Sequence, residues 1–187
     1  MIRCFIAVDI TEAVKTELEA LLAPLKKADA DVKWVETGNL HLTLKFLGDA
    51  TMERVAQIQS FLKELCSKEK SFPVHFSGLG AFPVMDHPKV IWVGADEGES
   101  GLKMLAEKIA AGVEEMGFAK ESRAFSAHLT LGRVRGPRGV KELAKAMKAS
   151  VFSSAHKVLI EHVTFYKSTL SQEGPLYEEI GRFYFGG

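Results

Sequence analysis

Two short segments of this chain carry the side chains best suited to acid–base chemistry. The tetrapeptide His-Leu-Thr-Leu begins at His41 and occurs again from His128, 87 residues further along. In a β-strand, successive side chains point to opposite faces, so the leucines of each segment would enter a core. The histidine and threonine would then lie side by side on the other face. If the two halves pack about a pseudo-two-fold axis, two imidazoles and two hydroxyls converge, which is enough for paired acid–base chemistry on a phosphate.

These residue types favour phosphate as the reacting group. A histidine has an ordinary pKa of about 6.5, so near neutral pH one imidazole can be neutral while the other is protonated. One can take a proton from a nucleophile while the other protonates a leaving oxygen. The hydroxyls of Thr43 and Thr130 can donate hydrogen bonds to phosphoryl oxygens without adding negative charge.

Arg133 follows Thr130 by three residues and could bind the phosphate through two parallel hydrogen bonds. Strict alternation, however, places Arg133 on the leucine face of its strand. We expect it to reach the site only if the strand ends or bulges near Gly132, which a glycine permits. Arg135 and Arg138 in the following loop either contact an RNA backbone or lie in solvent.

No metal and no cofactor are expected at this site. Two histidines and two threonines make a poor zinc ligand set, and neither a carboxylate nor a thiolate near the motifs completes it. We therefore interpret the site as metal-independent.

A third His-x-Thr pair, His162 and Thr164, shows that the pattern alone is weak evidence. The first half has no matching pair at the equivalent place, so we expect His162 to have no role at the site. Three further histidines also lack a repeat partner: His75, His87 and His156. The alternative for His41 and His128 is that both are structural residues, kept when a stable unit was duplicated.

Each half of the chain has the pattern of a helix, the strand with the motif, a second helix and two further strands. The spacing of apolar residues predicts helices over residues 11–28, 51–69, 100–116 and 139–149. Strands are predicted over residues 2–9, 32–35, 40–47, 72–82, 89–95, 124–134, 157–168 and 175–185. This order indicates a duplicated α+β unit with mostly antiparallel sheets and helices outside.

Composition limits the classes of protein. The 187 residues suit one domain or two small fused lobes, and the formal net charge of zero argues against extended non-specific nucleic-acid binding. A local basic site is compatible with that balance. Cys4 and Cys66 have no metal-binding spacing, which suits a reduced cytosolic protein. No stretch approaches the roughly 20 apolar residues of a membrane span, and the apolar N-terminal run is too short for a signal peptide.

These motifs make the chain similar to the 2H phosphoesterase superfamily. Within it, the chain resembles the 2'-5' RNA ligase (LigT) family, also called RNA 2',3'-cyclic phosphodiesterases. The resemblance covers essentially the whole chain and is carried by segments 3–9, 41–48, 128–133, 166–168 and 174–177.

The resemblance implies a single bilobal, pseudo-symmetric domain, with lobes formed by repeats of about 1–97 and 98–187 and the site in a central cleft. It implies hydrolysis of a 2',3'-cyclic phosphate to a 2'-phosphomonoester. By analogy, His41 protonates the departing 3'-oxygen and His128 activates water, while Thr43, Thr130 and Arg133 hold the phosphate.

The implied partner is an RNA with a 2',3'-cyclic phosphate end, and we expect a cytoplasmic monomer without membrane association. Two alternatives stay open. One is a 2'-5' RNA ligase that joins tRNA halves by the reverse reaction, and the other is a non-catalytic module that binds RNA ends. An inactive binder would be expected to have lost a motif histidine or threonine, and this chain retains all four.

Aromatic side chains could hold the base, because stacking is worth roughly 1–3 kcal/mol per base. Phe5, Phe46 and Tyr166 are the candidates. Strict alternation of side chains places Phe46 on the leucine face of its strand, so packing in the core is the alternative to stacking on a base.

Overall fold

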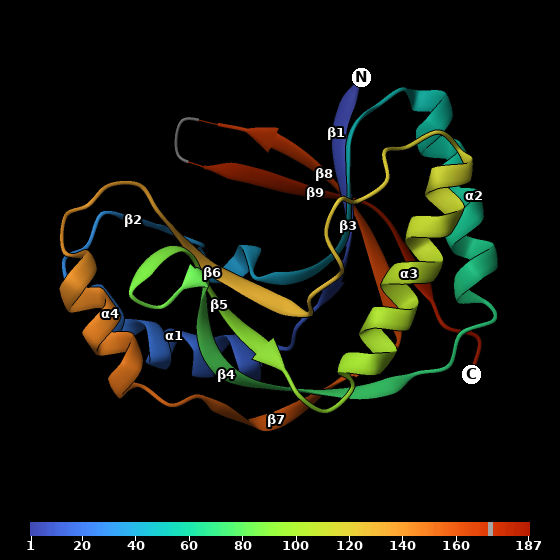
Figure 1. The fold of residues 1–187 in the computed structure, drawn as a ribbon. Coiled ribbons are helices and arrows are strands. Elements are labelled where there is room, and N and C mark those ends of the chain that lie inside the picture. Colours follow the sequence, from blue (N-terminus) through green and yellow to red (C-terminus); the bar gives the residue numbers. More distant parts are fainter. Residues whose placement is uncertain (172–173) are drawn as a thin grey trace.

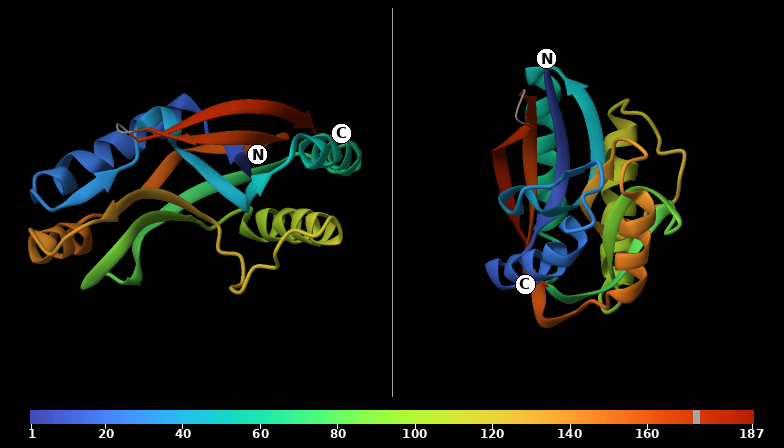
Figure 2. Two further views of the ribbon diagram at one scale, coloured as in Figure 1. Left: turned by 90° about the horizontal axis from the view of Figure 1, so that it is seen from above. Right: turned by 90° about the vertical axis from the view of Figure 1, so that its left-hand side faces the viewer.

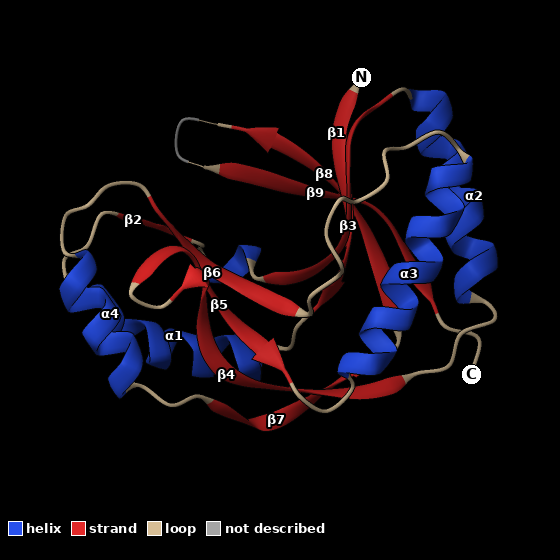
Figure 3. Ribbon diagram, viewed as in Figure 1, coloured by secondary structure: helices blue, strands red, loops and turns tan. Residues whose placement is uncertain are grey.

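The chain forms two antiparallel sheets with helices at their flanks (Figures 1 and 3). The computed structural model describes residues 1–171 and 174–187. Its strands are β1 (Ile2–Asp9), β2 (Val32–Trp34), β3 (His41–Ala50), β4 (Phe72–Val84), β5 (His87–Ala95), β6 (His128–Val134), β7 (Ser153–Ile160), β8 (His162–Leu170) and β9 (Pro175–Tyr184). Its α-helices are α1 (Glu12–Lys26), α2 (Met52–Cys66), α3 (Glu99–Glu115) and α4 (Val140–Ala149).

Helices α1 and α2 begin close to their predicted starts because their start signals are local. The hydroxyls of Thr11 and Thr51 accept hydrogen bonds from the backbone of Val14 (3.4 Å) and Arg54 (3.3 Å), which caps α1 and α2. The apolar faces of these helices are buried. Figure 2 shows α1 beside α4 at one end of the molecule and α2 beside α3 at the other, and both pairs are in contact. Each pair therefore combines one helix from each half of the chain.

The strands are shared between the halves more extensively than the sequence order suggests. One sheet has the order β3-β1-β8-β9 and the other β2-β6-β5-β4-β7. Strands β4 and β5 of the first half thus lie in the sheet of the second motif, and β8 and β9 of the second half lie in the sheet of the first. The repeats of about 1–97 and 98–187 describe the sequence, whereas each sheet is built from both ranges.

Several predicted strand boundaries differ from the structure, and three of the differences concern the motif strands or the division of one predicted strand into two. The single strand predicted over 157–168 is two strands, β7 and β8, which leave Glu161 between them and belong to different sheets. The strand predicted over 124–134 begins only at His128. Gly48 does not end β3: its φ of +72° accommodates an irregularity in the pairing, and the strand continues to Ala50.

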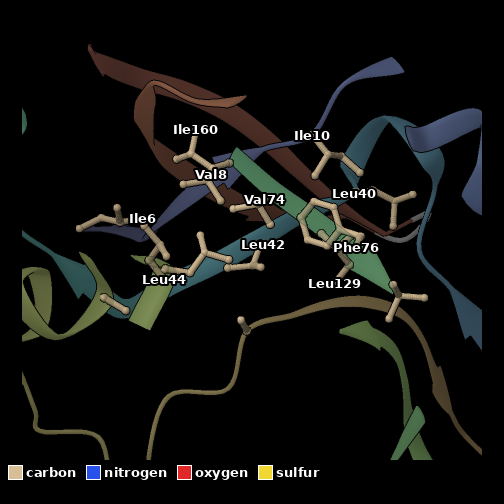
Figure 4. Close-up of a cluster of buried hydrophobic side chains, with 14 of the residues drawn as sticks. Ile6, Val8, Ile10, Leu40, Leu42, Leu44, Val74, Phe76, Leu129 and Ile160 are labelled. Carbon is tan, nitrogen blue, oxygen red and sulfur yellow. The ribbon is translucent and has the colours of Figure 1, made fainter. Parts of the chain in front are cut away.

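The leucine faces of both motif strands enter one continuous core. Leu42 of β3 and Leu129 of β6 are fully buried, and Figure 4 shows both near Phe76 of β4. This confirms the predicted direction of the leucines and leaves the histidines and threonines on the opposite faces.

Candidate functional site

The backbone holds the two motif histidines in the same way. Nδ1 of His41 lies 2.7 Å from the carbonyl oxygen of Asn39, and Nδ1 of His128 lies 2.8 Å from that of Ser126. A carbonyl can only accept, so Nδ1 of each ring carries the hydrogen and donates it. Nε2 is then the atom left for acid–base chemistry, and in His41 it lies 3.1 Å from Oγ1 of Thr43. The repeat thus extends from residue types to hydrogen bonding.

Both motif strands contain a β-bulge at the same place. In the β1–β3 ladder, Ala7 pairs with Thr43 and Ile6 with Lys45, so Leu44 is an extra residue. In the β5–β6 ladder, Thr130 and Gly132 pair with consecutive residues of β5, so Leu131 is extra. An extra residue reverses the alternation of faces beyond it.

The bulge in β6 brings Arg133 to the face of His128. Leu131 and Gly132 are both buried and Arg133 is exposed. The condition that strict alternation set for Arg133 is therefore met. Its guanidinium lies close enough for its charge to lower the pKa of His128.

The equivalent bulge in β3 moves Phe46 off the leucine face, contrary to the parity argument. Lys45 is buried at 2% exposure, and its ammonium donates to the carbonyl oxygen of Ala119 over 2.9 Å. Phe46 is 56% exposed, and its ring centroid lies 5.8 Å from that of Phe5. Phe46 occupies the place in the first motif that Arg133 occupies in the second.

The other two aromatic candidates lie beside His41. Phe5 is 2% exposed and stacks on the rings of His41 (4.8 Å) and Tyr166 (5.2 Å), so it supports the imidazole from the core side and has no open face for a base. Tyr166 is half-buried, and its hydroxyl donates to Asp9 over 2.6 Å. Among the three, Phe46 is the one whose ring is open to solvent.

Sequence reasoning missed three aromatic neighbours of the histidines. Tyr177 of β9 places its ring edge-on to His41 at 5.2 Å. Phe82 and Trp92 lie at 5.3 and 6.4 Å from His128, again edge-on. Tyr177 stands in one of the segments that carry the family resemblance, whereas nothing in the spacing of Phe82 and Trp92 points to the site.

The third His-x-Thr pair binds a carboxylate. His162 Nε2 lies 3.1 Å from Oδ2 of Asp9, and the Thr164 hydroxyl donates to the same oxygen over 2.7 Å. Burial alone would raise the pKa of Asp9, but these contacts and the hydrogen bond from Tyr166 hold it well below its usual range. Asp9 is also the cross-strand partner of His41. His162 is therefore a partner of Asp9, which in turn lies opposite His41. From the sequence, no role at the site was expected for His162.

A polar cavity of about 320 Å³ opens beside His41. Asp9, Asn39, His162, Tyr166, Tyr177 and Arg182 are among the residues that line it. The cavity lies on the side of the first motif, and His128 is not in its wall.

The two motif histidines differ in the charge beside them. Burial lowers the pKa of His41, while its hydrogen bond to Asn39 and the negative charge of Asp9 act in the opposite direction. Burial also lowers the pKa of His128, and there the positive charge of Arg133 lowers it further. Asp9 thus favours the protonated form of one imidazole and Arg133 the neutral form of the other.

Arg133 connects the two motif faces electrostatically. Besides its effect on His128, its charge acts on Tyr177, whose pKa is nevertheless raised because the phenol is buried. Tyr177 in turn contacts His41. The arrangement offers two imidazoles, two hydroxyls and one guanidinium, which is a set suited to acid–base chemistry on an anionic group.

Thiols and metal-binding clusters add nothing to this set within the described part of the chain. Burial raises the pKa of Cys4 to about 11 and that of Cys66 to about 12, so both thiols stay protonated and unreactive near neutral pH. Residues 1–171 and 174–187 contain no cluster of three or more His, Cys, Asp or Glu side chains placed to hold a metal ion. Within these same residues, no helix is both long and apolar enough to cross a membrane.

Comparison with known proteins gives consistent matches over the full length. The family described as LigT like Phosphoesterase matches twice, over residues 8–92 and 93–177. A Methanothermobacter thermautotrophicus protein named RNA 2',3'-cyclic phosphodiesterase is 32% identical over 97% of this chain and 98% of its own length. An Archaeoglobus fulgidus protein of the same name is 33% identical over 97% of this chain and 99% of its own.

Solved structures share the fold. A crystal structure of a Thermus thermophilus protein matches with a TM-score of 0.82 and 27% identity, over 99% of this chain and 98% of that one. The structure of E. coli LigT complexed with 3'-AMP matches with a TM-score of 0.79 and 20% identity, over 100% of this chain and 99% of that one. At that identity, the second likeness concerns the fold alone.

Proposed function

The chain belongs to the LigT-like phosphoesterase family, and we propose that it hydrolyses the 2',3'-cyclic phosphate at RNA ends to a 2'-phosphomonoester. One observation carries the proposal: the duplicated motif holds both histidines by Nδ1 and leaves both Nε2 atoms for proton transfer. The names of the full-length relatives point to the same reaction.

The charges beside the histidines support one assignment of roles. His41, whose proton affinity Asp9 increases, is the acid that protonates the departing 3'-oxygen. His128, whose proton affinity Arg133 decreases, is the base that takes a proton from the attacking water. The tetrapeptides alone are identical and could not distinguish these roles.

The remaining polar groups hold the phosphate. Thr43 and Thr130 donate hydrogen bonds to its non-bridging oxygens, and the Arg133 guanidinium meets the charge that develops on them. Phe46 is the residue placed to stack on a base, since its ring is exposed on the same face as His41. A cytoplasmic monomer acting on RNA ends, tRNA halves among them, is the setting in which we expect this reaction.

The test uses an oligonucleotide that ends in a 2',3'-cyclic phosphate, followed by a phosphatase that removes only 3'-phosphates. We expect the cyclic end to open and the phosphate to resist that phosphatase, and we expect activity to survive an excess of chelator. Release of phosphate from most ends would show the opposite regiochemistry. Adding a second RNA with a 5'-hydroxyl in the same assay tests the ligase alternative, because a joined product would appear only if the reverse reaction is significant.

A further inference from the structure

Exposed cationic residues are concentrated in the segment that runs from Arg133 of the site through the following loop to α4. There are six of them between positions 133 and 148: Arg133, Arg135, Arg138, Lys141, Lys145 and Lys148. One acidic residue, Glu142, lies in the same segment, so its net charge is +5 in a chain whose net charge is zero. We call these six residues the α4 basic surface.

The corresponding segment of the first repeat lacks this charge. Residues 46–61 lie at the same distance after the first motif and contain two acids, Asp49 and Glu53, and one cation, Arg54. The two repeats match in their motifs, their bulges and the Nδ1 hydrogen bonds of their histidines but differ here by six units of charge, from −1 to +5. The concentration of cations therefore belongs to the second repeat and is not part of the duplicated pattern.

Ion pairs neutralise only part of the α4 basic surface. Arg138 pairs with Asp29 over 2.7 Å, and Lys148 pairs with Asp86. Among the described residues, none forms an ion pair with the other four cations, Arg133, Arg135, Lys141 and Lys145.

The shape of this region suits an extended polyanion. Two backbone hydrogen bonds hold the loop between β6 and α4 against Asp31. The amide of Arg135 donates to the carbonyl oxygen of Asp31 (2.8 Å), and the amide of Asp31 donates to the carbonyl oxygen of Arg138 (3.1 Å). Figure 1 shows α4 at the edge of the molecule, beyond the end of β6. The buried side of α4 holds Leu143 and Met147. On the other side, Lys141, Lys145 and Lys148 line a groove of about 350 Å³ together with Asp86.

We propose that the RNA strand leading to the cyclic phosphate runs from Arg133 over the α4 basic surface, so that its backbone phosphates contact Lys141 and Lys145. This inference rests on the proposed function, because it assumes an RNA end at the motif histidines. It makes the protein selective for length: an oligonucleotide gains contacts that a single nucleoside 2',3'-cyclic phosphate cannot make.

The test compares two double variants that remove the same charge. Lys141→Gln with Lys145→Gln removes two exposed lysines of the α4 basic surface. Lys63→Gln with Lys103→Gln removes two exposed lysines from α2 and α3 at the opposite end of the molecule. Binding of a single-stranded RNA of about a dozen nucleotides is measured by fluorescence anisotropy over a range of salt concentrations, which requires no turnover.

We expect the α4 double variant to bind this RNA roughly tenfold more weakly at about 0.1 M salt. Its plot of log affinity against log salt should be shallower by about 1.4, because each phosphate contact to a single strand contributes about 0.7. The control variant should bind like the unmodified protein, and both should hydrolyse the nucleoside cyclic phosphate at an unchanged rate.

Two results would overturn the inference. Equal losses of RNA affinity in both variants would mean that only the overall charge of the protein matters. Unchanged RNA binding in the α4 variant would mean that the RNA does not contact this surface, which would then fit a different partner, such as an acidic protein. Failure of the proposed function has a separate signature, since the unmodified protein would then leave the nucleoside cyclic phosphate intact while the binding comparison could still be made.

Discussion

The motif histidines of this protein are equivalent in backbone geometry and unequal in electrostatics. Each donates Nδ1–H to the carbonyl two residues before it. Asp9 adds a negative charge beside His41, and Arg133 adds a positive charge beside His128. Under the proposed function, a pseudo-symmetric site can run an asymmetric reaction, because neighbours outside the repeated tetrapeptides distinguish the acid from the base.

The first prediction concerns pH. Burial lowers the pKa of both histidines, so the maximum of kcat/KM, which reports the free enzyme, should lie below about pH 6.5. Activity should fall on the alkaline side as the acid loses its proton and on the acidic side as the base gains one. The two apparent pKa values belong to the interacting pair. A profile flat from about pH 5 to 9 would contradict two titrating histidines.

Asp9→Asn should move one limb of that profile. Removing the negative charge beside His41 lowers the pKa of the acid, so the alkaline limb should shift to lower pH while the acidic limb stays in place. Asp49→Asn, an exposed acid on the same strand as His41, is the matched control and should leave both limbs unchanged. An Asp9→Asn profile that only decreases in height would indicate that Asp9 has a structural effect alone.

The second prediction separates the three His-x-Thr histidines. His41→Ala and His128→Ala should each reduce kcat by a factor of roughly 10²–10⁴, which is the usual contribution of a general acid or base. The double variant should lose little more activity than the more damaged of the two single variants. His162→Ala removes a hydrogen bond to Asp9 and a ring contact with Tyr184 but neither reacting imidazole, so its loss should be smaller than about tenfold. If His162→Ala were as damaging as His41→Ala, the repeat would be a poor guide to the reacting groups.

Residue types and spacing are enough to locate the motif groups, and they do not locate the groups around them. His41, Thr43, His128 and Thr130 stand out as candidates because the chain repeats them. Asp9 lies opposite His41 only through the pairing of β1 with β3, and Tyr177 reaches it only through β9. Such neighbours depend on strand pairing between distant segments, which periodicity within one strand does not encode.

At the scale of elements, the bulges decide which side chains reach the site. Without the extra residues Leu44 and Leu131, Phe46 and Arg133 would point into the core. The alternation of side chains between the two faces of an ideal strand is therefore broken at the fifth residue of each motif, Lys45 and Gly132, both of which are buried. Helix ranges were predictable from caps and apolar spacing, whereas the break at Glu161 lacks a glycine or proline to mark it.

The third prediction tests the close packing beside the second bulge. A Cβ atom at Gly132 would lie 2.8 Å from both Trp34 Cε3 and Val32 Cγ1, so Gly132→Ala must displace these two side chains or the strand β2 that carries them. We expect a loss of roughly 1–3 kcal/mol in the free energy of unfolding, and reduced activity because Arg133 moves with the strand. Chemical denaturation measures the first effect and kcat the second.

Gly38→Ala provides the comparison for that variant, because a Cβ there meets no atom within 4 Å. Its free energy of unfolding should stay close to that of the unmodified protein. Equal stability of Gly132→Ala and Gly38→Ala would show that β2 yields without cost, and that this contact does not hold the bulge in place.

At the scale of the whole molecule, duplication has produced two sheets that cannot be separated by cutting the chain at the repeat boundary. The first half would keep β4 and β5 without β6, their neighbour in the sheet, and the second would keep β8 and β9 without β1. The core is continuous across both sheets, and each helix pair also joins the halves. The site therefore depends on the intact chain, since the sheet that holds each motif strand is completed by strands from both halves.

The last prediction follows from this exchange. Residues 1–97 and 98–187 made as separate chains should each be largely unfolded by circular dichroism, because each would expose sheet edges and half of the common core to water. The intact protein should unfold in urea in a single transition, with coincident curves from circular dichroism and tryptophan fluorescence. Trp34 and Trp92 both lie in the sheet of the second motif, so fluorescence follows that sheet while circular dichroism follows the whole chain. Two separated transitions, or one fragment that folds alone, would mean that the repeats are stable units and that the exchanged strands add little to their stability.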